Sequence, residues 1–295
     1  MLKSLLGIAP KQEPDGSFSP SWLALKLATS DTTDYQPVAY EPYTGRRSKI
    51  LVVFTEQKNM RMKNGLEFST GNHPVESLVP MLHLKNAGFD FEVATVSGKP
   101  VVLEQWAMPT KDASVMGLYR DLKPQLEAPR SLGDVLPDLD AESYAAVFVP
   151  GGHGAMLGIP EDPNVGTLLR WAHDEGLHTI TLCHGPGSLL ATTLEGQDFL
   201  YAGYEMAVFP DSVDKQTPMI GYLPGHMPWE LSTRLEDLGA KIVNTKGDDT
   251  CVVDRRLITG ASPQASDRLG RLAATTLLEH LGQVPSASRN APMSR

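Results

Sequence analysis

Short apolar segments alternate with helical segments along most of the chain, and this alternation limits the fold more than any other feature. The apolar segments are almost continuously hydrophobic, which is typical of strands covered by helices on both faces. The helical segments mostly begin at proline and end before glycine, as helix termini commonly do. These repeated units predict an α/β fold with a doubly wound, mostly parallel sheet flanked by helices (flavodoxin-like). The expected strands are 49–54, 91–96, 145–149 and 178–182, with later candidates at 206–209, 241–244, 250–253 and 256–259. The expected helices are 74–87, 163–175, 228–238 and 263–281.

The segments outside this rhythm predict the domain organisation. Residues 1–48 are rich in Pro, Ser, Asp and Thr and are interpreted as an extended N-terminal arm. Residues 49–282 form the expected α/β catalytic domain, in which about 97–140 are interrupted by prolines and predict a small inserted subdomain. The polar stretch 283–295 predicts a disordered tail. Four apolar residues of the arm are expected to pack it against the domain: Trp22, Leu23, Tyr35 and Tyr40.

Composition excludes several classes of protein. The 26 Lys+Arg and 35 Asp+Glu leave a formal charge of −9, which opposes binding to a phosphate backbone or an anionic membrane. No apolar run approaches the roughly 18–20 residues that cross a bilayer. The two cysteines, Cys183 and Cys251, are too few for a disulfide scaffold and fit a reducing compartment. We therefore expect a cytoplasmic globular protein without a membrane partner.

The sharpest local feature is the segment TITLCHGPGS, in which an apolar strand ends at Cys183. His184, Gly185 and Pro186 then turn the chain into a helix. Such a turn lifts a side chain above the carboxyl edge of a sheet, where open α/β folds bind ligands. The helix N-terminus would favour the thiolate and lower the pKa of Cys183. The alternative is an ordinary buried cysteine at the end of a strand.

Two further segments could complete a site around Cys183. In VPGGHG, Gly151 and Gly152 follow a strand and let backbone N–H groups approach a ligand, as an oxyanion hole requires; strand-Gly-Gly turns without function are also common. In STGNHPVE, Glu76 falls at the third position of a helix. A carboxyl beside a thiolate stays protonated and could shuttle a proton, whereas the alternative is a capping-box glutamate.

A last segment, FPDSVD, carries Asp211 and Asp214 after a short strand. Either carboxylate could orient His184. From the local pattern alone, both are better explained as aspartates that cap a turn.

Together these segments resemble the PfpI superfamily, also called class I glutamine amidotransferase-like. Within it they resemble the bacterial subfamily of heat-shock chaperones with glyoxalase III and deglycase activity. The resemblance extends from about residue 43 to 281 and includes the arm and the inserted subdomain. Its motifs are FSTGNHPVESLVP, AGFDFEVATVSG, WAMPTKD, AVFVPGGHGAMLGIPE, LCHGPGSLLA, FPDSVDKQTPMIGYLPGH and LITGASP.

The resemblance implies a role for each site residue. Cys183 matches the nucleophile, His184 the triad histidine, Asp214 rather than Asp211 the triad acid, and Glu76 the acid beside the cysteine. The backbone groups of Gly151, Gly152 and His184 would bind the oxyanion. The implied activity is conversion of methylglyoxal to D-lactate without glutathione, with deglycation of glyoxal adducts on proteins and nucleic acids. Chaperoning of unfolded proteins and a homodimeric state are also implied.

The sequence departs from this subfamily at its metal site. The better-known members hold a metal with two histidines and a carboxylate, but the matching positions here are Lys85, Asp90 and Leu122. An ammonium group and an aliphatic side chain cannot replace two imidazoles, so we expect no metal there and no organic cofactor. The remaining histidines are interpreted as packed or pocket-lining side chains rather than ligands: His73, His83, His153 and His226.

These assignments predict a mechanism and leave three alternatives open. The Cys183 thiolate would attack the aldehyde carbon of methylglyoxal, and Glu76 or His184 would move a proton between the two carbons through an enediol. The resulting thioester would be hydrolysed to lactate. The first alternative is a holdase chaperone with little catalysis. The second is a cysteine peptidase for short peptides, and the third is an α/β protein with a redox-sensing cysteine.

Overall fold

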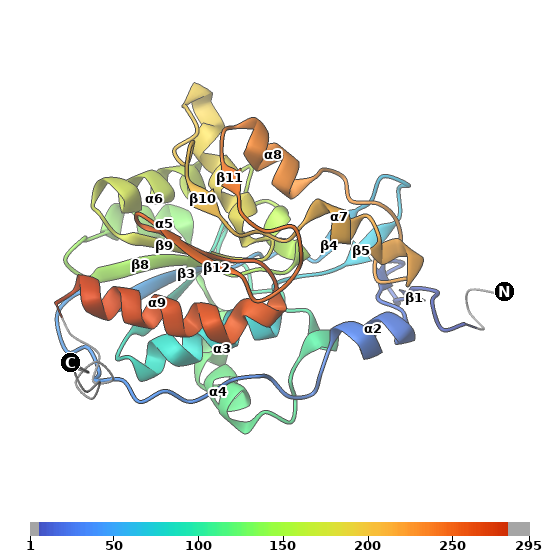
Figure 1. Cartoon of the computed structure of the whole chain (residues 1–295), viewed down its shortest axis with the longest axis horizontal. Helices are drawn as coiled ribbons and strands as arrows, with labels where there is room; N and C mark the ends of the chain where they lie inside the picture. Colours follow the sequence, from blue (N-terminus) through green and yellow to red (C-terminus); the bar gives the residue numbers. More distant parts are fainter. Residues whose placement is uncertain (1–5, 283–295) are drawn as a thin grey trace, which may run out of the picture.

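A central sheet of seven strands organises the part of the chain that the computed structural model describes, residues 6–282 (Figure 1). Neighbouring strands run parallel except β12, which is antiparallel to β13. The predicted doubly wound, mostly parallel sheet is therefore confirmed. In order across the sheet, the strands are β12 (Cys251–Asp254), β13 (Leu257–Gly260), β9 (His178–Leu182), β8 (Tyr144–Val149), β3 (Lys49–Val53), β6 (Asp90–Thr95) and β7 (Arg130–Ser131).

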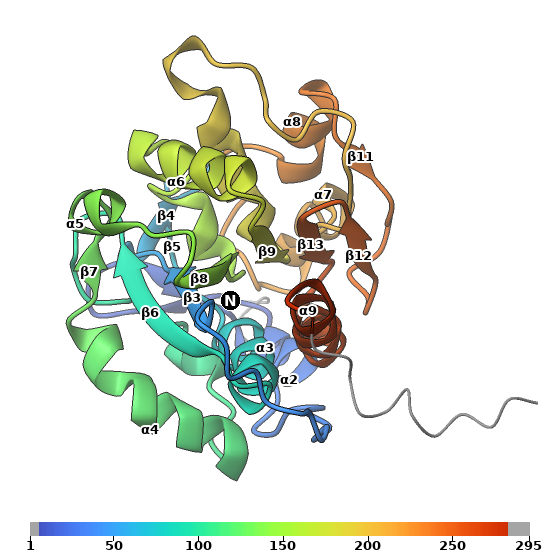
Figure 2. The same cartoon turned by 90° about the vertical axis from the view of Figure 1, so that its left-hand side faces the viewer.

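Helices cover both faces of this sheet (Figure 2). In β3, Ile50 and Val52 point into one core, while Leu51 and Val53 point into the other. Successive side chains of a strand point to opposite faces, so both faces of a buried strand must be apolar. The first core is closed by α3 (Pro74–Asn86), α4 (Ala113–Glu127) and α9 (Ser266–His280). The second is closed by α5 (Leu132–Val135), α6 (Pro163–Asp174) and η4 (Gly185–Gly196).

Helix ends agree with the sequence at most positions and differ at two. Helices α3 and α6 begin at Pro74 and Pro163 as expected. Helix α8 (Leu231–Asp237) begins three residues later than expected, because the Asp211 carboxylate accepts hydrogen bonds from the backbone N–H groups of Ser232 and Thr233. Before α9, the turn η6 (Pro263–Ala265) is a 3₁₀ helix.

Two predicted strands are shorter than expected and lie outside the central sheet. β10 (Glu205–Met206) and β11 (Lys241–Ile242) pair with each other in parallel. Beyond them the Asn244 side chain bonds the backbone N–H and C=O of Val208 at 3.0 and 2.8 Å, which replaces the ladder. A side chain that satisfies the backbone in this way ends the pairing.

A small second sheet and the segment after β6 complete the architecture. The small sheet contains β1 (Lys11–Gln12), β2 (Phe18–Ser19), β5 (Glu67–Ser69) and β4 (Asn59–Arg61). Residues 97–140 contain η1 (Gln105–Ala107), α4, β7, α5 and η2 (Leu136–Asp138). Because β7 pairs with β6, this segment joins the central sheet. Its limits as a subdomain, and the arm and tail boundaries, stay predictions; residues 283–295 lie outside the described part.

The arm carries α2 (Trp22–Ala28), which faces solvent with its largest side chain. Trp22 is 66 % exposed, so the expectation that it packs against the domain is wrong. Ala24 is the residue of α2 that is buried, and Lys26 lies over the Trp22 ring. A seven-residue helix has room to bury one narrow face, and here the small alanine takes that position. Among residues 6–282, no helix has the length and apolar character that crossing a membrane requires.

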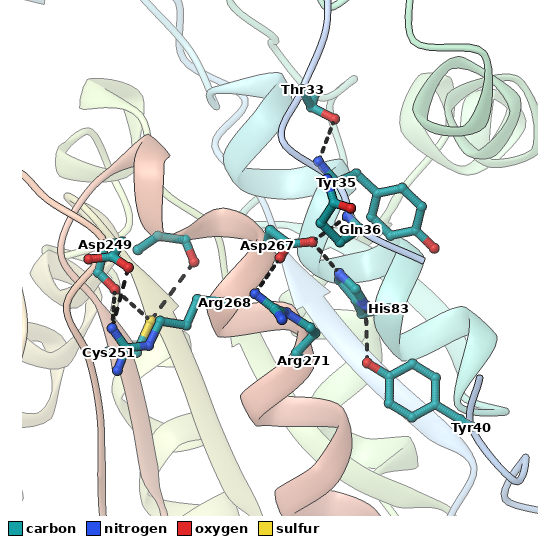
Figure 3. Close-up of polar contacts among 11 residues, drawn as sticks. Thr33, Tyr35, Gln36, Tyr40, His83, Asp249, Cys251, Asp267, Arg268 and Arg271 are labelled. Carbon is teal, nitrogen blue, oxygen red and sulfur yellow. Dashed lines mark hydrogen bonds and ion pairs between the residues drawn. The ribbon is translucent and has the colours of Figure 1, made fainter. Parts of the chain in front are cut away.

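Further along, the arm is attached to the domain around His83, a fully buried residue of α3 (Figure 3). The Tyr40 hydroxyl lies 3.0 Å from Nδ1 of His83, and Tyr35 packs against its ring. Nε2 of His83 lies 2.8 Å from Oδ1 of Asp267 on α9, and the same oxygen accepts the backbone N–H of Gln36 at 2.8 Å. One buried imidazole thus joins α3, α9 and the arm. Tyr35 and Tyr40 pack the arm against the domain, as expected.

Replacing His83 by alanine should destabilise the fold by about 2–3 kcal/mol, because it leaves a cavity and removes a hydrogen-bond partner from the buried Asp267 and the half-buried Tyr40. Burial lowers the pKa of His83, although Asp267 opposes this shift. The folded state therefore binds fewer protons than the unfolded chain below about pH 6.5, and stability is lost as the pH falls. Urea unfolding at pH 7 and pH 5 should show a smaller pH effect in His83→Ala. His173→Ala, on the exposed end of α6, should change stability by less than about 0.5 kcal/mol; an equal loss there would contradict the role of His83.

Candidate active site

Cys183 lies at a sharp turn directly after β9, at the carboxyl edge of the sheet. Its φ is +60°, a left-handed conformation that is rare for residues other than glycine and costs of order 1–3 kcal/mol. Two backbone hydrogen bonds hold it there, from Cys183 N–H to Gly260 C=O and from Phe209 N–H to Cys183 C=O. The segment that follows, η4, is a 3₁₀ helix that begins at Gly185. The predicted strand-to-helix turn is therefore present.

His184 connects Cys183 to Asp214. Sγ of Cys183 lies 3.3 Å from Nδ1 of His184, and Nε2 of His184 lies 2.9 Å from Oδ2 of Asp214. Asp214 ends the short helix α7 (Asp211–Asp214) and is buried. Burial would raise the pKa of Asp214, but His184 and His153 outweigh it and hold that pKa well below its usual range. The ionised Asp214 can orient His184 and stabilise its protonated form.

His153 joins Cys183, His184 and Asp214 as a fourth residue of the site. The sequence analysis gave it no role beside Asp214. Its Nε2 lies 3.1 Å from the other oxygen of Asp214, and its ring lies 4.1 Å from that of His184. It belongs to η3 (His153–Met156), directly after Gly152. Its position in the VPGGHG motif was the available signal. The interpretation as a pocket-lining side chain agrees with its place in the cavity wall, but its contact with Asp214 depends on a turn 61 residues away.

The same three residues are the group within residues 6–282 that could hold a metal ion. Ligand atoms of His153, His184 and Asp214 lie within 4.8 Å of one another, and all three side chains are buried. Hydrogen bonds to Asp214 already occupy the Nε2 atom of each histidine. A metal would have to replace these bonds. The geometry therefore fits a hydrogen-bonded triad at least as well as a metal centre.

Glu76 approaches Cys183 from the first turn of α3. It is 1 % exposed and contacts both the thiol of Cys183 and the backbone N–H of Gly152. The capping-box alternative does not apply, because the backbone N–H of His73 donates to Gly151 C=O at 2.9 Å instead. Burial raises the pKa of Glu76 well above its usual value. The buried position of Glu76 therefore favours its protonated form.

The loop after β8 requires its glycines. A Cβ on Gly151 would collide with the Glu76 carboxyl and with the backbone carbonyl of Leu182. Gly152 has φ +100°, and its backbone N–H lies beside both Cys183 and Glu76, where it favours the charged form of either group. An amide in this position can also bind an oxygen that becomes negative on a carbon attached to Sγ.

The pKa of Cys183 differs from the sequence-based expectation. Burial raises it well above the usual value, and an ionised Glu76 would raise it further. The predicted lowering is therefore wrong, because the thiol is 3 % exposed and loses more from desolvation than the turn supplies. The thiol thus needs a base, and Nδ1 of His184 is within reach.

A cavity of about 370 Å³ lies over these groups. Leu27 and Ala28 of α2 form part of its rim, so the arm limits its entrance. The polar and titratable residues in its wall include His73, Glu76, Glu104, His153, Cys183 and Tyr222. A cavity of this size suits a small molecule or the end of a side chain better than an extended peptide.

Comparison with known proteins agrees with this geometry. Residues 50–199 match the model of the DJ-1/PfpI family. The chain belongs to the DJ-1/PfpI family. It is 47 % identical over 276 residues to the protein/nucleic acid deglycase HchA of Pseudomonas aeruginosa strain UCBPP-PA14, a match that covers 92 % of this chain and 94 % of that one. It is 46 % identical to the Escherichia coli O157:H7 protein of the same name, over 90 % of this chain and 93 % of that one.

Solved structures in the DJ-1/PfpI fold confirm the architecture. Glyoxalase III of Candida albicans superposes with a TM-score of 0.61 at 20 % identity, covering 78 % of this chain and 98 % of that one. The 24 kDa Rapid Encystment Protein of Francisella tularensis superposes with a TM-score of 0.66 at 18 % identity, covering 78 % of this chain and 99 % of that one. At these identities the likeness concerns the fold.

The three positions at which the resemblance implied a departure from a metal site are not among the residues that line the cavity. Nζ of Lys85 is 2.7 Å from Oδ1 of Asp90, and Leu122 on α4 is buried in the core. These side chains form an ion pair and an apolar contact. The absence of a metal there stays a prediction.

Replacing Asp214 by asparagine should lower kcat for the implied conversion of methylglyoxal about 10²- to 10⁴-fold. The imidazole of His184 would lose the negative charge that orients it and stabilises its protonated form. Asp211→Asn is the matched control from the same motif. Asp211 caps α8, so that variant should lose about 0.5–2 kcal/mol of stability and keep its kcat. Steady-state kinetics and thermal unfolding of both variants distinguish the two roles. Equal kcat losses would contradict the assignment of Asp214.

Proposed function

We propose that this chain is a cytoplasmic, cysteine-dependent enzyme acting on small 2-oxoaldehydes. It would convert methylglyoxal to D-lactate without glutathione and remove the same carbonyl compounds from early adducts on proteins and nucleic acids. The observation that carries the proposal is Cys183 at a strained turn, between His184 and Glu76, in a small cavity. The deglycase names of relatives 46–47 % identical support it.

The first step is attack of the sulfur on the aldehyde carbon. Nδ1 of His184, 3.3 Å from Sγ, takes the thiol proton, and Asp214 stabilises the imidazolium. The aldehyde oxygen becomes negative next to the N–H of Gly152. The protonated Glu76 then gives its proton to this oxygen, which completes the hemithioacetal and leaves Glu76 as a carboxylate.

The second step moves a hydrogen between the two carbons. The Glu76 carboxylate takes the proton from the former aldehyde carbon, and the electrons of the neighbouring C=O move onto its oxygen, which gives an enediolate. Glu76 returns that proton to the neighbouring carbon. The hydroxyl proton on the first carbon passes to the oxygen of the neighbouring carbon, and the first carbon becomes a thioester. Water then hydrolyses the thioester: Glu76 accepts a proton from the water, and protonated His184 returns one to the leaving sulfur. Each group ends in its starting state.

The wild-type protein tests the proposal directly. Incubated with methylglyoxal in the absence of glutathione, it should release D-lactate, measured by a stereospecific lactate assay. Absence of lactate, or equal amounts of both enantiomers, would overturn the proposal. The second outcome would point to conversion without a shaped site.

The peptidase and holdase alternatives stay predictions, and the same preparation distinguishes them. A peptidase should cleave short fluorogenic peptides, but the arm helix α2 narrows the entrance of the cavity. A holdase should suppress aggregation of a client protein even after Cys183 is alkylated, because a holding surface does not need the thiol. The implied homodimer also stays a prediction, with the mass in solution as its measurement.

A further inference from the structure

Glu104 is a second buried carboxyl group of the cavity, and the mechanism above does not use it. It precedes η1 and is 1 % exposed. Its backbone is held by hydrogen bonds from Glu104 N–H to Asn72 C=O and from Ala107 N–H to Glu104 C=O. Oε1 accepts a hydrogen bond from the Thr70 hydroxyl at 2.7 Å. The side chain therefore has a defined position in the wall that also contains Cys183.

The other oxygen of Glu104 has no partner. Within residues 6–282, Oε2 of Glu104 is a buried polar atom without a hydrogen bond, and so are Oε2 of Glu76 and Nδ1 of His73. All three residues line the same cavity. A buried polar group without a partner costs about 1–3 kcal/mol, so such groups need an explanation. Three of them around one cavity indicate a ligand with several polar atoms of its own.

The surroundings of Glu104 raise its pKa, so that both the protonated and the charged form are accessible near neutral pH. Burial raises its pKa to about 7, while His153 and Thr70 oppose the shift. The titratable groups that face it inside the cavity are Glu76, His153 and Tyr222. Glu104 also lines a second cavity of about 250 Å³ together with Glu13 and Lys58.

We propose that Glu104 is a catalytic acid that holds the second oxygen of the substrate, the one on the carbon next to the carbon that Cys183 attacks. This inference rests on the proposed function and extends it to a substrate class. The substrate must carry two oxygens on adjacent carbons, one bound near Gly152 and Glu76 and the other at Oε2 of Glu104.

The proton balance of the reaction defines what Glu104 does. When Glu76 removes the hydrogen from the first carbon, the electrons of the second C=O move onto its oxygen, and Glu104 supplies the proton that this oxygen takes up. When Glu76 delivers its proton to the second carbon, the hydroxyl on the first carbon loses its proton to Glu104 as the thioester C=O forms. Glu104 bridges two vicinal oxygens and ends protonated, as it began. No oxidant or further reactant is needed, because the first carbon is oxidised as the second is reduced.

The test compares Glu104→Gln and Thr70→Val with the wild-type protein, using methylglyoxal. Glutamine keeps the shape of the side chain but cannot give up a proton, so kcat should fall about 10²-fold. In the wild type, kcat/KM should fall as the pH rises through about 7, where Glu104 loses its proton. Glu104→Gln should lack this fall in kcat/KM. Thr70→Val removes the hydrogen bond that favours the charged form of Glu104, so the fall in kcat/KM should occur at higher pH.

Alkylation of Cys183 by iodoacetamide is the control, because it needs no second oxygen. Its rate should stay within about threefold in both variants, which shows that the nucleophile is intact. An active wild type with unchanged kcat and an unchanged pH profile in both variants would overturn the role of Glu104 alone. A wild type that makes no lactate would overturn the proposed function and this inference together. If Glu104→Gln does not fold, the pH profile of Thr70→Val decides the question.

Discussion

Replacing Cys183 by alanine should lower D-lactate formation from methylglyoxal by about 10³-fold or more, because the variant cannot form the hemithioacetal. The residual rate should equal that of the protein-free solution. The fold should survive, since the change removes a single sulfur atom from a buried residue that borders a cavity. Stereospecific lactate assays and thermal unfolding of the same samples measure the two effects separately.

Cys251→Ala is the matched control for this experiment. Cys251 is the other cysteine of the chain and lies on β12, where Sγ contacts the backbone carbonyl of Asp249 (Figure 3). It does not line the cavity that contains Cys183. The control variant should therefore keep the full rate. Retention of more than a few per cent of the rate in Cys183→Ala would show that another group is the nucleophile.

Replacing Glu76 by glutamine should lower kcat about 10²- to 10⁴-fold while the alkylation of Cys183 continues. Glutamine fits the place of the carboxyl but cannot carry a proton between two carbons. The expected split is a large loss of kcat with little change in KM, because Glu76 moves a proton in the transition state rather than anchoring the substrate. Rapid alkylation with slow turnover would confirm that the nucleophile is intact while proton transfer is lost, and steady-state kinetics measure kcat and KM.

The stability of Glu76→Gln should also change with pH in a defined direction. Burial raises the pKa of Glu76 in the folded state, so the folded state binds more protons than the unfolded chain above about pH 4.5. Wild-type stability from this site is therefore present below that pH and is lost as the pH rises. Urea unfolding should show that the variant gains stability relative to the wild type as the pH rises above about 4.5. A constant difference across this range would mean that Glu76 is not neutral in the folded protein.

Periodicity and helix-terminus residues were sufficient for most of the fold. Continuous apolar runs predicted β3, β6, β8 and β9 within one residue at either end, because a strand buried on both faces allows no polar residue. The errors occurred where a distant side chain intervened. The capping of α8 by Asp211 and the bonding of Val208 by Asn244 both depend on partners more than twenty residues away.

The candidate site divides in the same way. Cys183, Gly151 and Gly152 could be found locally, because a strand followed by a tight turn has a signature in the residues themselves. The capping explanation was as good as the functional one for Glu76 and better for Asp214, until the structure showed their contacts with Cys183 and His184. Family resemblance, rather than local pattern, had favoured Asp214 over Asp211.

The amino-acid pattern alone was enough for the sheet, the helices that cover it and the turn that presents Cys183, since each of these depends on neighbours in the chain. The tertiary structure decided the protonation of the site. Burial raises the pKa of Cys183, Glu76 and Glu104, and only the packed fold determines which groups lose water. It also decided that His153 shares Asp214 with His184 and that Glu104 faces the cavity, because these contacts join segments that no local period connects.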